Sequence, residues 1–300
     1  MIDPLFTVFT PTYNRAHTLE RVYESLLAQT FKNFEWLIVD DGSIDTTYEI
    51  VRRLVTEDKM TIRYFSQANS GKHVAFNLGV EKARGELFLT LDSDDSCIAT
   101  ALERFNQAWS EISEPLRSKF SGITCLCKDE YGKIVGRPLP RQTLEGVPYK
   151  IISKYRLKGE KWGFHRTEIL KKFPFPVFSG EKFIPESLVW NRIGNSYQIK
   201  FINEALRNYF NSNDSLTKST IQIRKLSPNG TFLYYFETLH LQLPVQDLIR
   251  ASANIWRFSI HNGQVIKIFQ KKRRVIFLIA GFFIGGGLFI IDKFKSILSK

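Results

Sequence analysis

Adjacent aspartates occur at two places in the first hundred residues. Asp40 and Asp41 are neighbours, and Asp92, Asp94 and Asp95 fill three of four consecutive positions. Carboxylates this close raise one another's proton affinity, so the second cluster favours a counter-cation. Oxygen ligands suit a hard divalent ion such as Mg²⁺ or Mn²⁺, and a short ligand set leaves positions for a substrate diphosphate. Capping of a following helix is the alternative explanation.

The elements that would position these acids alternate along the first 130 residues. Short apolar segments, typical of buried parallel strands, are separated by stretches with helical spacing. The pattern predicts an α/β fold with a mostly parallel central sheet and helices on both faces. Ligands of such sheets bind beyond the carboxyl ends of the strands, where both acidic clusters lie. The expected strands are Phe6–Thr10, Phe34–Val39, Thr61–Phe65 and Leu87–Leu91.

Three motifs in this region resemble a known family. They are PTYNR at 11–15, QTFKNFEWLIVDDGSID at 29–45 and NSGKHVAFNLGVEKARGELFLTLDSDD at 69–95. In order, spacing and residue type, residues 5–100 resemble the family 2 glycosyltransferases, which have the nucleotide-sugar-binding fold called GT-A. The resemblance implies an inverting, metal-dependent transfer of a sugar from a nucleoside diphosphate, usually a UDP-sugar. The processive signature QxxRW is absent, which favours addition of one sugar per encounter.

The resemblance implies a role for each loop at the strand ends. Asp41 corresponds to the carboxylate that accepts a hydrogen bond from the uracil ring. Asp92 and Asp94 resemble acids near the ribose and the metal, and Asp95 resembles the acid that coordinates the metal between the two phosphates. The loop that lines the nucleoside corresponds to Thr10, Pro11, Tyr13, Asn14 and Arg15.

One position departs from the family pattern. Many members have an Arg directly before the Asn of the third loop, whereas Phe76 precedes Asn77 here. Asn77 is kept as a nucleotide-sugar-binding candidate. Lys72 is then the cation expected near the pyrophosphate, where it would offset the charge of the leaving diphosphate. A solvated surface lysine is the alternative interpretation.

The region after residue 100 is patterned less regularly, and we expect it to face the acceptor. The sequence predicts a β-hairpin at Leu126–Val135, and a strand with a short helix within Leu157–Pro176. Aromatic and basic side chains there could contact a sugar, although core packing explains the tryptophans equally well and a structural role suits the histidine. These acceptor-side candidates are Trp162, His165, Trp190 and Arg192.

A carboxylate at a helix start is the candidate general base, which must take the proton of the acceptor hydroxyl as it attacks. Pro185 suits a first helical turn and an apolar stripe follows it, so Glu186 would lie at the helix N-terminus. In most of the family this place holds a Glu-Asp pair whose Asp is the base. Glu181 is the alternative base, and a purely helix-stabilising role for Glu186 is a third interpretation.

The C-terminal part is helical in period from about Thr220 and contains a long apolar run. Val275–Ile291 has no charge over 17 residues, and basic residues flank it on both sides. As a helix it would span about 25 Å, less than the roughly 30 Å of hydrocarbon in a bilayer. The glycines at 285–287 favour a break. The charge pattern favours a monotopic or re-entrant helix over a spanning one, and a core or dimer helix is the remaining alternative.

The net charge of +12 is concentrated in the same tail. Residues 263–300 hold eight Lys and Arg against one Asp, which is +7 and leaves +5 for the rest of the chain. A basic groove for nucleic acid across the body is therefore disfavoured. The three cysteines suit core packing in a reducing compartment. The first residues lack the pattern of a signal peptide.

These inferences predict a division of the chain and a function. Residues 1–215 would form the catalytic domain, with nucleotide-sugar binding in 1–100 and the acceptor side in 101–215, before a helical extension at 216–262 and a membrane-associating tail at 263–300. We expect transfer of one sugar to a glycan hydroxyl, on a polyprenyl-diphosphate-linked acceptor, in cell-surface polysaccharide synthesis at the cytoplasmic face of the membrane. A homodimer stays open, and a catalytically inactive nucleotide-sugar-binding module is the rival hypothesis.

Overall fold

The chain forms two compact units in the computed structural model. Unit 1 consists of residues 1–175 and 192–213, and unit 2 of residues 176–191 and 214–300. The segment 176–191, which the sequence placed in the catalytic domain, therefore groups with the C-terminal helices. The residues that the structure describes are 3–210, 220–263 and 275–298.

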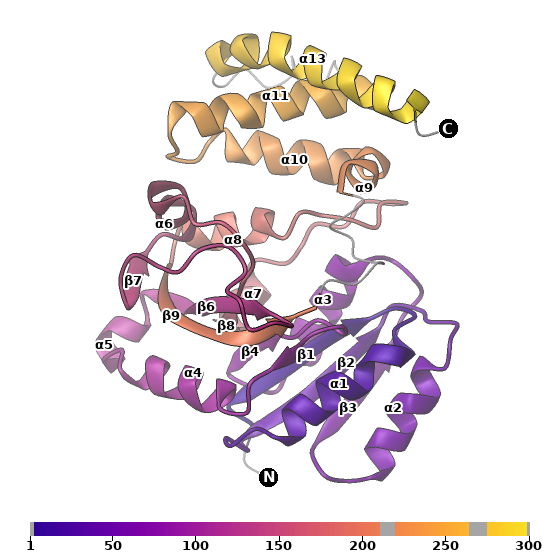
Figure 1. Ribbon diagram of the computed structural model, residues 1–300, viewed down its shortest axis with the longest axis vertical. Helices are drawn as coiled ribbons and strands as arrows, with labels where there is room; N and C mark the ends of the chain where they lie inside the picture. The colour runs from indigo at the N-terminus through magenta and orange to yellow at the C-terminus, as the bar shows by residue number, and fades with distance from the viewer. Residues whose placement is uncertain (1–2, 211–219, 264–274, 299–300) are drawn as a thin grey trace. The chain divides into compact units, whose positions relative to one another are not determined.

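A mixed nine-stranded sheet forms the centre of unit 1 (Figure 1). Its strands are β1 (Phe6–Thr12), β2 (Phe34–Asp40), β3 (Ile62–Ser66), β4 (Leu87–Thr90), β5 (Ser96–Cys97), β6 (Phe120–Asp129), β7 (Thr143–Gly146), β8 (Lys161–Arg166) and β9 (Gln198–Tyr209). Their order is β3-β2-β1-β4-β8-β6-β9-β5, and β7 pairs with β9. The first four strands are mutually parallel, whereas β8 runs antiparallel to both β4 and β6. The predicted α/β class and its four strands are confirmed.

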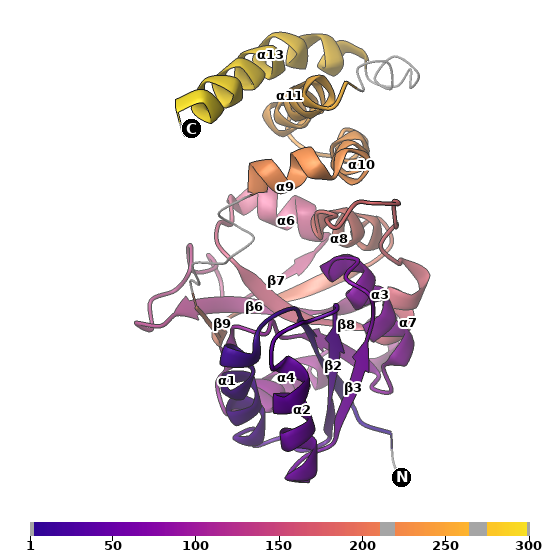
Figure 2. The ribbon, with the colours of Figure 1, turned by 90° about the vertical axis from the view of Figure 1, so that its right-hand side faces the viewer.

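Helices cover both faces of the parallel strands (Figures 1 and 2). One face carries α1 (Ala16–Leu27), α2 (Thr47–Thr56) and α4 (Ala101–Ser110), and the other carries α3 (Lys72–Lys82) and α7 (Thr167–Lys172). Side chains alternate between these faces along β1, because successive residues of a strand point to opposite sides. Phe6 and Val8 join the core beneath α1, while Phe9 packs against Phe76 and Phe88 on the α3 side.

The irregular part of unit 1 contains the predicted hairpin and strand-helix pair. A turn folds the chain back on β6, since Lys128 pairs antiparallel with Ile134 and Val135 N–H donates to Cys127 O at 2.9 Å. β8 and α7 lie within the range predicted to hold a strand and a short helix. Two further helices are α5 (Glu114–Arg117) and α6 (Pro148–Tyr155). All three cysteines are buried and unpaired, as expected for core packing.

Unit 2 is helical, which confirms the predicted C-terminal helices. Its helices are α9 (Thr220–Leu226), α10 (Pro228–Thr238), α11 (Val245–His261) and α13 (Val275–Leu298), and α8 (Ser187–Gly194) begins in this unit. Leu248, Ile255 and Trp256 of α11 form a core with Leu278 of α13. No helix within the described ranges is long and apolar enough to cross a bilayer.

The helix break predicted at residues 285–287 is absent, since α13 continues through the glycines. The direction in which each glycine faces explains why the helix does not break there. A Cβ atom on Gly285 would lie 2.4 Å from Ala253 O of α11, whereas one on Gly286 or Gly287 would meet nothing within 4 Å. Gly285 therefore permits close approach of α13 to α11, and this packing offsets the low helix propensity of glycine.

Candidate functional site

The loops after β1 and β2 begin at the same edge of the sheet, because the two strands pair in parallel register. Asn14 N–H donates to Ser43 Oγ at 2.8 Å, and Ile44 N–H donates to Asn14 Oδ1 at 2.9 Å. Asn14 has φ +52°, a left-handed conformation that Asn adopts more readily than most residues. These bonds hold the two loops together and leave the Tyr13 side chain 46% exposed at the site.

The other members of the predicted nucleoside loop are less accessible. Thr10 and Pro11 are buried within β1, and the Thr10 hydroxyl accepts a hydrogen bond from Trp36 Nε1 at 2.9 Å. Arg15, directly before α1, is half-buried, and its N–H donates to Thr47 Oγ1 at 3.3 Å. Thr10 and Pro11 therefore support the loop from within the sheet.

Asp41 orders the third loop. Its Oδ1 accepts hydrogen bonds from Gln67 Nε2 at 2.7 Å and Ser70 N–H at 2.8 Å, and its Oδ2 accepts one from Gly71 N–H at 2.7 Å. A carboxylate offers about four acceptor positions, so these three donors leave room for one more. The sequence did not predict this ordering role, and the uracil contact stays a prediction that the remaining acceptor position would permit.

Two cations lie against the predicted metal-binding acids. Lys72 Nζ is 2.7 Å from Asp92 Oδ1, and Arg207 Nε is 3.2 Å from Asp95 Oδ2. Arg207 Nη1 also lies 3.8 Å from Asp92 Oδ2, which joins the two acids through one guanidinium. Asp95 Oδ1 accepts a hydrogen bond from Phe210 N–H at 3.0 Å. The carboxyl ends of β4 and β9 thus meet in one charged cluster.

The pKa values of Asp92 and Asp95 are shifted in opposite directions. Burial raises the pKa of Asp95 to about 7. The attraction of Arg207 opposes this rise but does not cancel it, and repulsion from Asp92 and Asp94 adds to it. Burial also opposes ionisation of Asp92, but Lys72 and Arg207 together hold its pKa below the usual value. Asp95 is therefore a buried carboxyl that lacks sufficient positive charge at neutral pH, which a bound cation would supply.

The acid cluster fits a metal ion that is shared with a substrate. Within the described ranges, no three His, Cys, Asp or Glu side chains are grouped to hold an ion by themselves. A Mg²⁺ or Mn²⁺ held by one or two carboxylates and completed by phosphate oxygens needs no such group. Asp95 would supply the buried carboxyl. Asp94 directly precedes it, and the Asp94 carbonyl oxygen accepts a hydrogen bond from Arg21 Nη1 at 2.8 Å.

Sequence reasoning missed Arg207, the central cation of this cluster. It is 5% exposed on β9 and also lies 3.8 Å from Glu160. The region around residue 207 had no predicted strand, so nothing in the sequence pattern indicated that Arg207 would be buried.

Asn77 and Phe76 have structural contacts on α3. Asn77 Nδ2 donates to Phe175 O, and Phe175 N–H donates to Asn77 Oδ1, both at 2.9 Å. Phe76, where many family members have Arg, is 6% exposed among Phe9, Phe88 and Phe175. Phe76, at the position where many family members have Arg, is therefore part of an apolar core. Lys72 is the residue of α3 whose positive charge lies beside Asp92.

Of the acceptor-side candidates on β8, Trp162 is part of the core of unit 1 and His165 is half-buried. Trp162 is 3% exposed, packs against Phe105 and donates Nε1–H to Thr90 O, which matches the core alternative. Burial lowers the pKa of His165 to about 4, so its ring is neutral at physiological pH. Trp190 and Arg192, both half-buried on α8, keep their place as acceptor-side predictions.

The two base candidates lie in unit 2 with different surroundings. Glu186 directly precedes α8, as predicted, and its side chain is exposed. Glu181 is buried, and its carboxylate accepts from Asn229 N–H at 2.8 Å, Asn229 Nδ2 at 2.7 Å and Gly230 N–H at 2.9 Å. Glu181 thus caps the N-terminus of α10. Glu186 is the exposed carboxylate of this segment.

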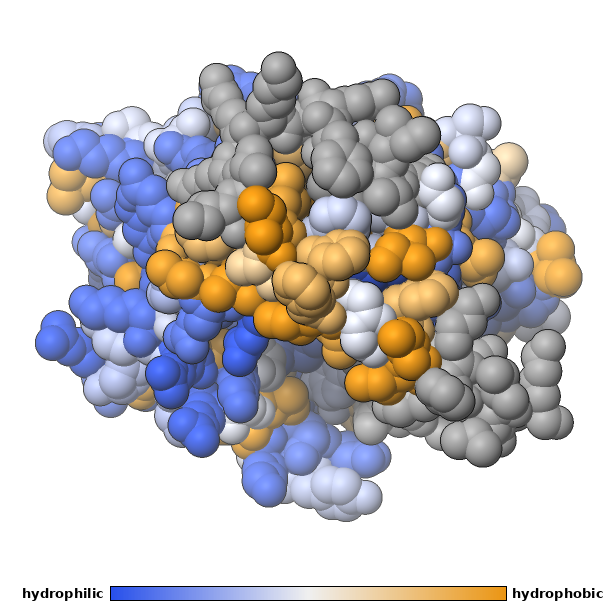
Figure 3. All heavy atoms as spheres, turned by 90° about the horizontal axis from the view of Figure 1, so that it is seen from above, coloured by the Kyte–Doolittle hydropathy of each residue, from blue (hydrophilic) through white to orange (hydrophobic). Residues whose placement is uncertain are grey.

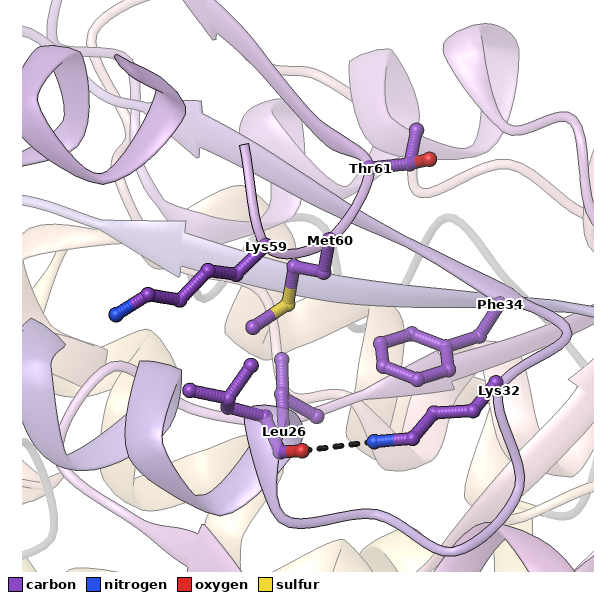
Figure 4. A pocket seen from close by; sticks show the side chains of 7 residues that line it. Leu26, Lys32, Phe34, Lys59, Met60 and Thr61 are labelled. Carbon is purple, nitrogen blue, oxygen red and sulfur yellow. Dashed lines mark hydrogen bonds between the residues drawn. The ribbon is translucent and has the colours of Figure 1, made fainter. Parts of the chain in front are cut away.

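A small pocket at the opposite edge of the sheet is separate from this site (Figure 4). Phe34 at the start of β2 and Thr61 before β3 line it, so it lies at the amino ends of the parallel strands. Lys32 at its rim donates to Leu27 O at 2.9 Å, where it terminates α1. The pocket therefore has no part in the chemistry of the acid cluster.

Known proteins resemble this chain in sequence. Residues 7–113 match the family described as Glycosyl transferase family 2. An "Uncharacterized glycosyltransferase" of Haemophilus influenzae is 37% identical over 101 residues, which are 34% of this chain and 40% of that protein. The "Putative teichuronic acid biosynthesis glycosyltransferase TuaG" of Bacillus subtilis is 33% identical over 126 residues, 42% of this chain and 49% of that protein. The chain spans less than half the length of these relatives.

Solved structures resemble it in fold. S. aureus TarS 1-349 in complex with UDP-GlcNAc has a TM-score of 0.61 at 20% identity, covering 92% of this chain and 79% of that one. The mannosyltransferase PcManGT from Pyrobaculum calidifontis, in complex with GDP-Man and Mn²⁺, has a TM-score of 0.56 at 17% identity, covering 98% and 89%. The fold is therefore GT-A. Residues 7–113, about a third of the chain, are similar to the family 2 glycosyltransferases.

Proposed function

We propose that this protein is an inverting, metal-dependent glycosyltransferase that moves one sugar from a UDP-sugar to a hydroxyl group of a glycan. The observation that carries the proposal is Asp95, a buried carboxyl with a pKa near 7 at the carboxyl edge of the sheet. Its place in the fold suits a cation that arrives with a diphosphate. UDP-GlcNAc bound to TarS, and GDP-Man with Mn²⁺ bound to PcManGT, support this interpretation.

The residues of unit 1 would bind and orient the donor. Asp95 and Asp94 would hold the divalent ion, which when bound supplies positive charge to the leaving diphosphate. Lys72, 2.7 Å from Asp92, would add a second positive charge near the phosphates. Tyr13 offers an exposed ring for the base, and the fourth acceptor position of Asp41 would take a uracil N–H.

Glu186 would remove the proton of the acceptor hydroxyl. A general base needs an accessible carboxylate, and Glu186 is exposed at the start of α8 whereas Glu181 is buried and bonded to α10. Trp190 and Arg192 follow on the same helix and would contact the acceptor sugar. Displacement by the hydroxyl from the face opposite the diphosphate inverts the anomeric carbon in one step, so no covalent enzyme intermediate is required.

The acceptor would be lipid-linked, on a polyprenyl diphosphate at the cytoplasmic face of the membrane. The +7 charge of residues 263–300 supports attraction to anionic lipid. The printed name of the Bacillus subtilis relative, a putative teichuronic acid biosynthesis enzyme, supports a role in cell-surface polysaccharide synthesis. The proposed site of action is therefore the inner surface of the cell membrane.

A donor screen tests this proposal. Nucleotide release is measured with UDP- and GDP-sugars and Mn²⁺, with and without a polyprenyl-diphosphate-linked glycan. The expected result is release from a UDP-sugar that depends on the acceptor. Binding of UDP without turnover across the panel would instead support an inactive nucleotide-sugar-binding module.

Glu186→Gln separates binding from chemistry. The amide keeps the size of the side chain but accepts no proton, so UDP-sugar affinity should persist while transfer falls by roughly 100-fold or more. Glu130→Gln, an exposed glutamate in the turn after β6, is the matched control. An unchanged transfer rate in Glu186→Gln would assign the base role to another group.

A further inference from the structure

Helix α13 has an inner face that is committed to α11. Ser252 Oγ donates to Phe277 O at 2.6 Å, and Trp256 Nε1 donates to Leu278 O at 2.7 Å. A Cβ atom on Gly281 would lie 2.1 Å from Ser252 Oγ, so the helices touch along this line. The two helices therefore form a packed hairpin, in which one side of α13 is unavailable to any other partner.

The single acid of residues 263–300 is turned into this hairpin. Asp292 is 5% exposed, and it accepts hydrogen bonds from both Nε and Nη2 of Arg257, with Nε at 2.7 Å. His261 Nε2 lies 3.0 Å from the same carboxylate. The one negative side chain of the tail is thus neutralised against α11, and it does not face outward.

The outer face of α13 is apolar and exposed. Ile279 is 62% exposed, Phe283 77% and Ile290 53%, at a spacing of four and seven residues that keeps them on one side of a helix. Phe282, Ile284 and Ile291 border this line and are also about half exposed. Figure 3 shows apolar side chains gathered into a band on the side of the molecule where α13 lies. No charged residue occurs between 275 and 291.

We propose that this outer face is a docking surface for an anionic phospholipid bilayer, with α13 lying along the membrane while its inner face stays on α11. The surface consists of Ile279, Phe282, Phe283, Ile284, Ile290 and Ile291. The proposal deepens the proposed function, because a lipid-linked acceptor would be reached from the membrane surface. An apolar helix face with basic residues at both ends is the pattern of an interfacial helix.

Charge favours a bilayer over a second copy of this chain. Four consecutive basic residues, 271–274, precede the apolar run, and Lys293 and Lys295 follow it. A twofold dimer through this face would bring the same +7 segment of two chains together, and like charges disfavour such a contact. Anionic headgroups complement the same charges, while the apolar band enters the boundary of the acyl chains.

Vesicle binding of the full chain tests the proposal. Flotation is measured with phosphatidylcholine vesicles, with and without phosphatidylglycerol, in the absence of nucleotide and acceptor. Wild type should bind the anionic vesicles and dissociate as salt rises. Phe283→Glu should weaken binding by roughly tenfold or more, since one exposed aromatic ring carries much of the apolar contact. Tyr131→Glu, at a residue 86% exposed in unit 1, is the matched control and should bind like wild type.

A fluorescent label tests the orientation of α13. The native cysteines are all buried, so a cysteine at position 283 can carry an environment-sensitive dye selectively. The dye should shift to the blue with anionic vesicles at position 283 and stay unchanged at a control cysteine replacing Tyr131. This readout needs no loss of binding, so it remains informative if Phe283→Glu folds poorly.

Several results would overturn the proposal. They are no binding of wild type to anionic vesicles, equal binding by Phe283→Glu, or an unshifted dye at position 283. Loss of self-association in Phe283→Glu, with vesicle binding unchanged, would assign the face to a second copy. Glycosyl transfer to a water-soluble acceptor is measured separately, so a failure of membrane docking and a failure of the proposed activity are distinct outcomes.

Discussion

At the scale of single residues, Arg207 is a buried cation shared by the two acids Asp92 and Asp95. Its guanidinium lies within 4 Å of three carboxylates, those of Asp92, Asp95 and Glu160, and it is 5% exposed. Buried carboxylates of like charge need such a partner to coexist in one site. Arg207 is thus a positioning residue. It holds Asp92 and Asp95, in the loop between β4 and β5, and would not itself contact the sugar.

We expect Arg207→Met to destabilise the fold and to disturb the acid cluster. Removing one partner of a buried ion pair costs roughly 3 kcal/mol, because the remaining charges are left without compensation. Urea unfolding measures this change, and Mn²⁺ binding in the presence of UDP reports the geometry of the acids. Arg207→Lys, which keeps the charge, should recover part of both. Equal stability and Mn²⁺ affinity in all three proteins would contradict the positioning role.

His165 should make stability depend on pH. Burial lowers its pKa from 6.5 to about 4, so the unfolded chain binds a proton in this interval that the folded chain does not. Its contribution is fully present above pH 6.5 and is lost as pH falls towards 4, by at most about 3 kcal/mol. His165→Gln should therefore flatten the pH dependence of the free energy of unfolding between these values. The same slope in the variant and the wild type would show that His165 titrates normally.

At the scale of elements, glycine spacing determines how closely α13 packs on α11. A Cβ atom at Gly285 would lie 2.4 Å from Ala253 O, and one at Gly286 would meet nothing within 4 Å. Adjacent glycines in one helix thus have opposite roles, which local helix propensity does not distinguish. This difference is the physical reason that α13 continues through residues 285–287.

The two neighbouring glycines provide a matched pair of variants. Gly285→Ala should lower the thermal midpoint of unfolding, because the new methyl group forces the helices apart. Gly286→Ala should raise stability by up to about 1 kcal/mol, since alanine is the better helix former and the position is open. Calorimetry measures the thermal midpoint of unfolding of both variants. Equal shifts of the midpoint would show that α13 does not pack on α11 through Gly285.

At the scale of the whole molecule, the sequence predicted the elements with strong periodicity and missed the contacts made across the sheet. The four parallel strands, the acid-bearing loops and Glu186 at a helix start were all expected. Arg207 was missed because β9 pairs in parallel with β6, about 80 residues away, and a contact over that separation leaves no local pattern. The role of Glu181 was missed for the same reason, since its donors lie 48 and 49 residues away.

The measurement that tests the central claim most directly is metal-dependent nucleotide release by Asp95→Asn. The amide has nearly the same shape as the carboxyl but carries no charge for a cation. Asp129→Asn, at the last residue of β6, is the matched control. Wild type and the control should release UDP from a UDP-sugar in proportion to bound Mn²⁺, and Asp95→Asn should lose at least roughly 100-fold of this rate. Full activity in Asp95→Asn, or turnover by wild type without any divalent ion, would contradict the account.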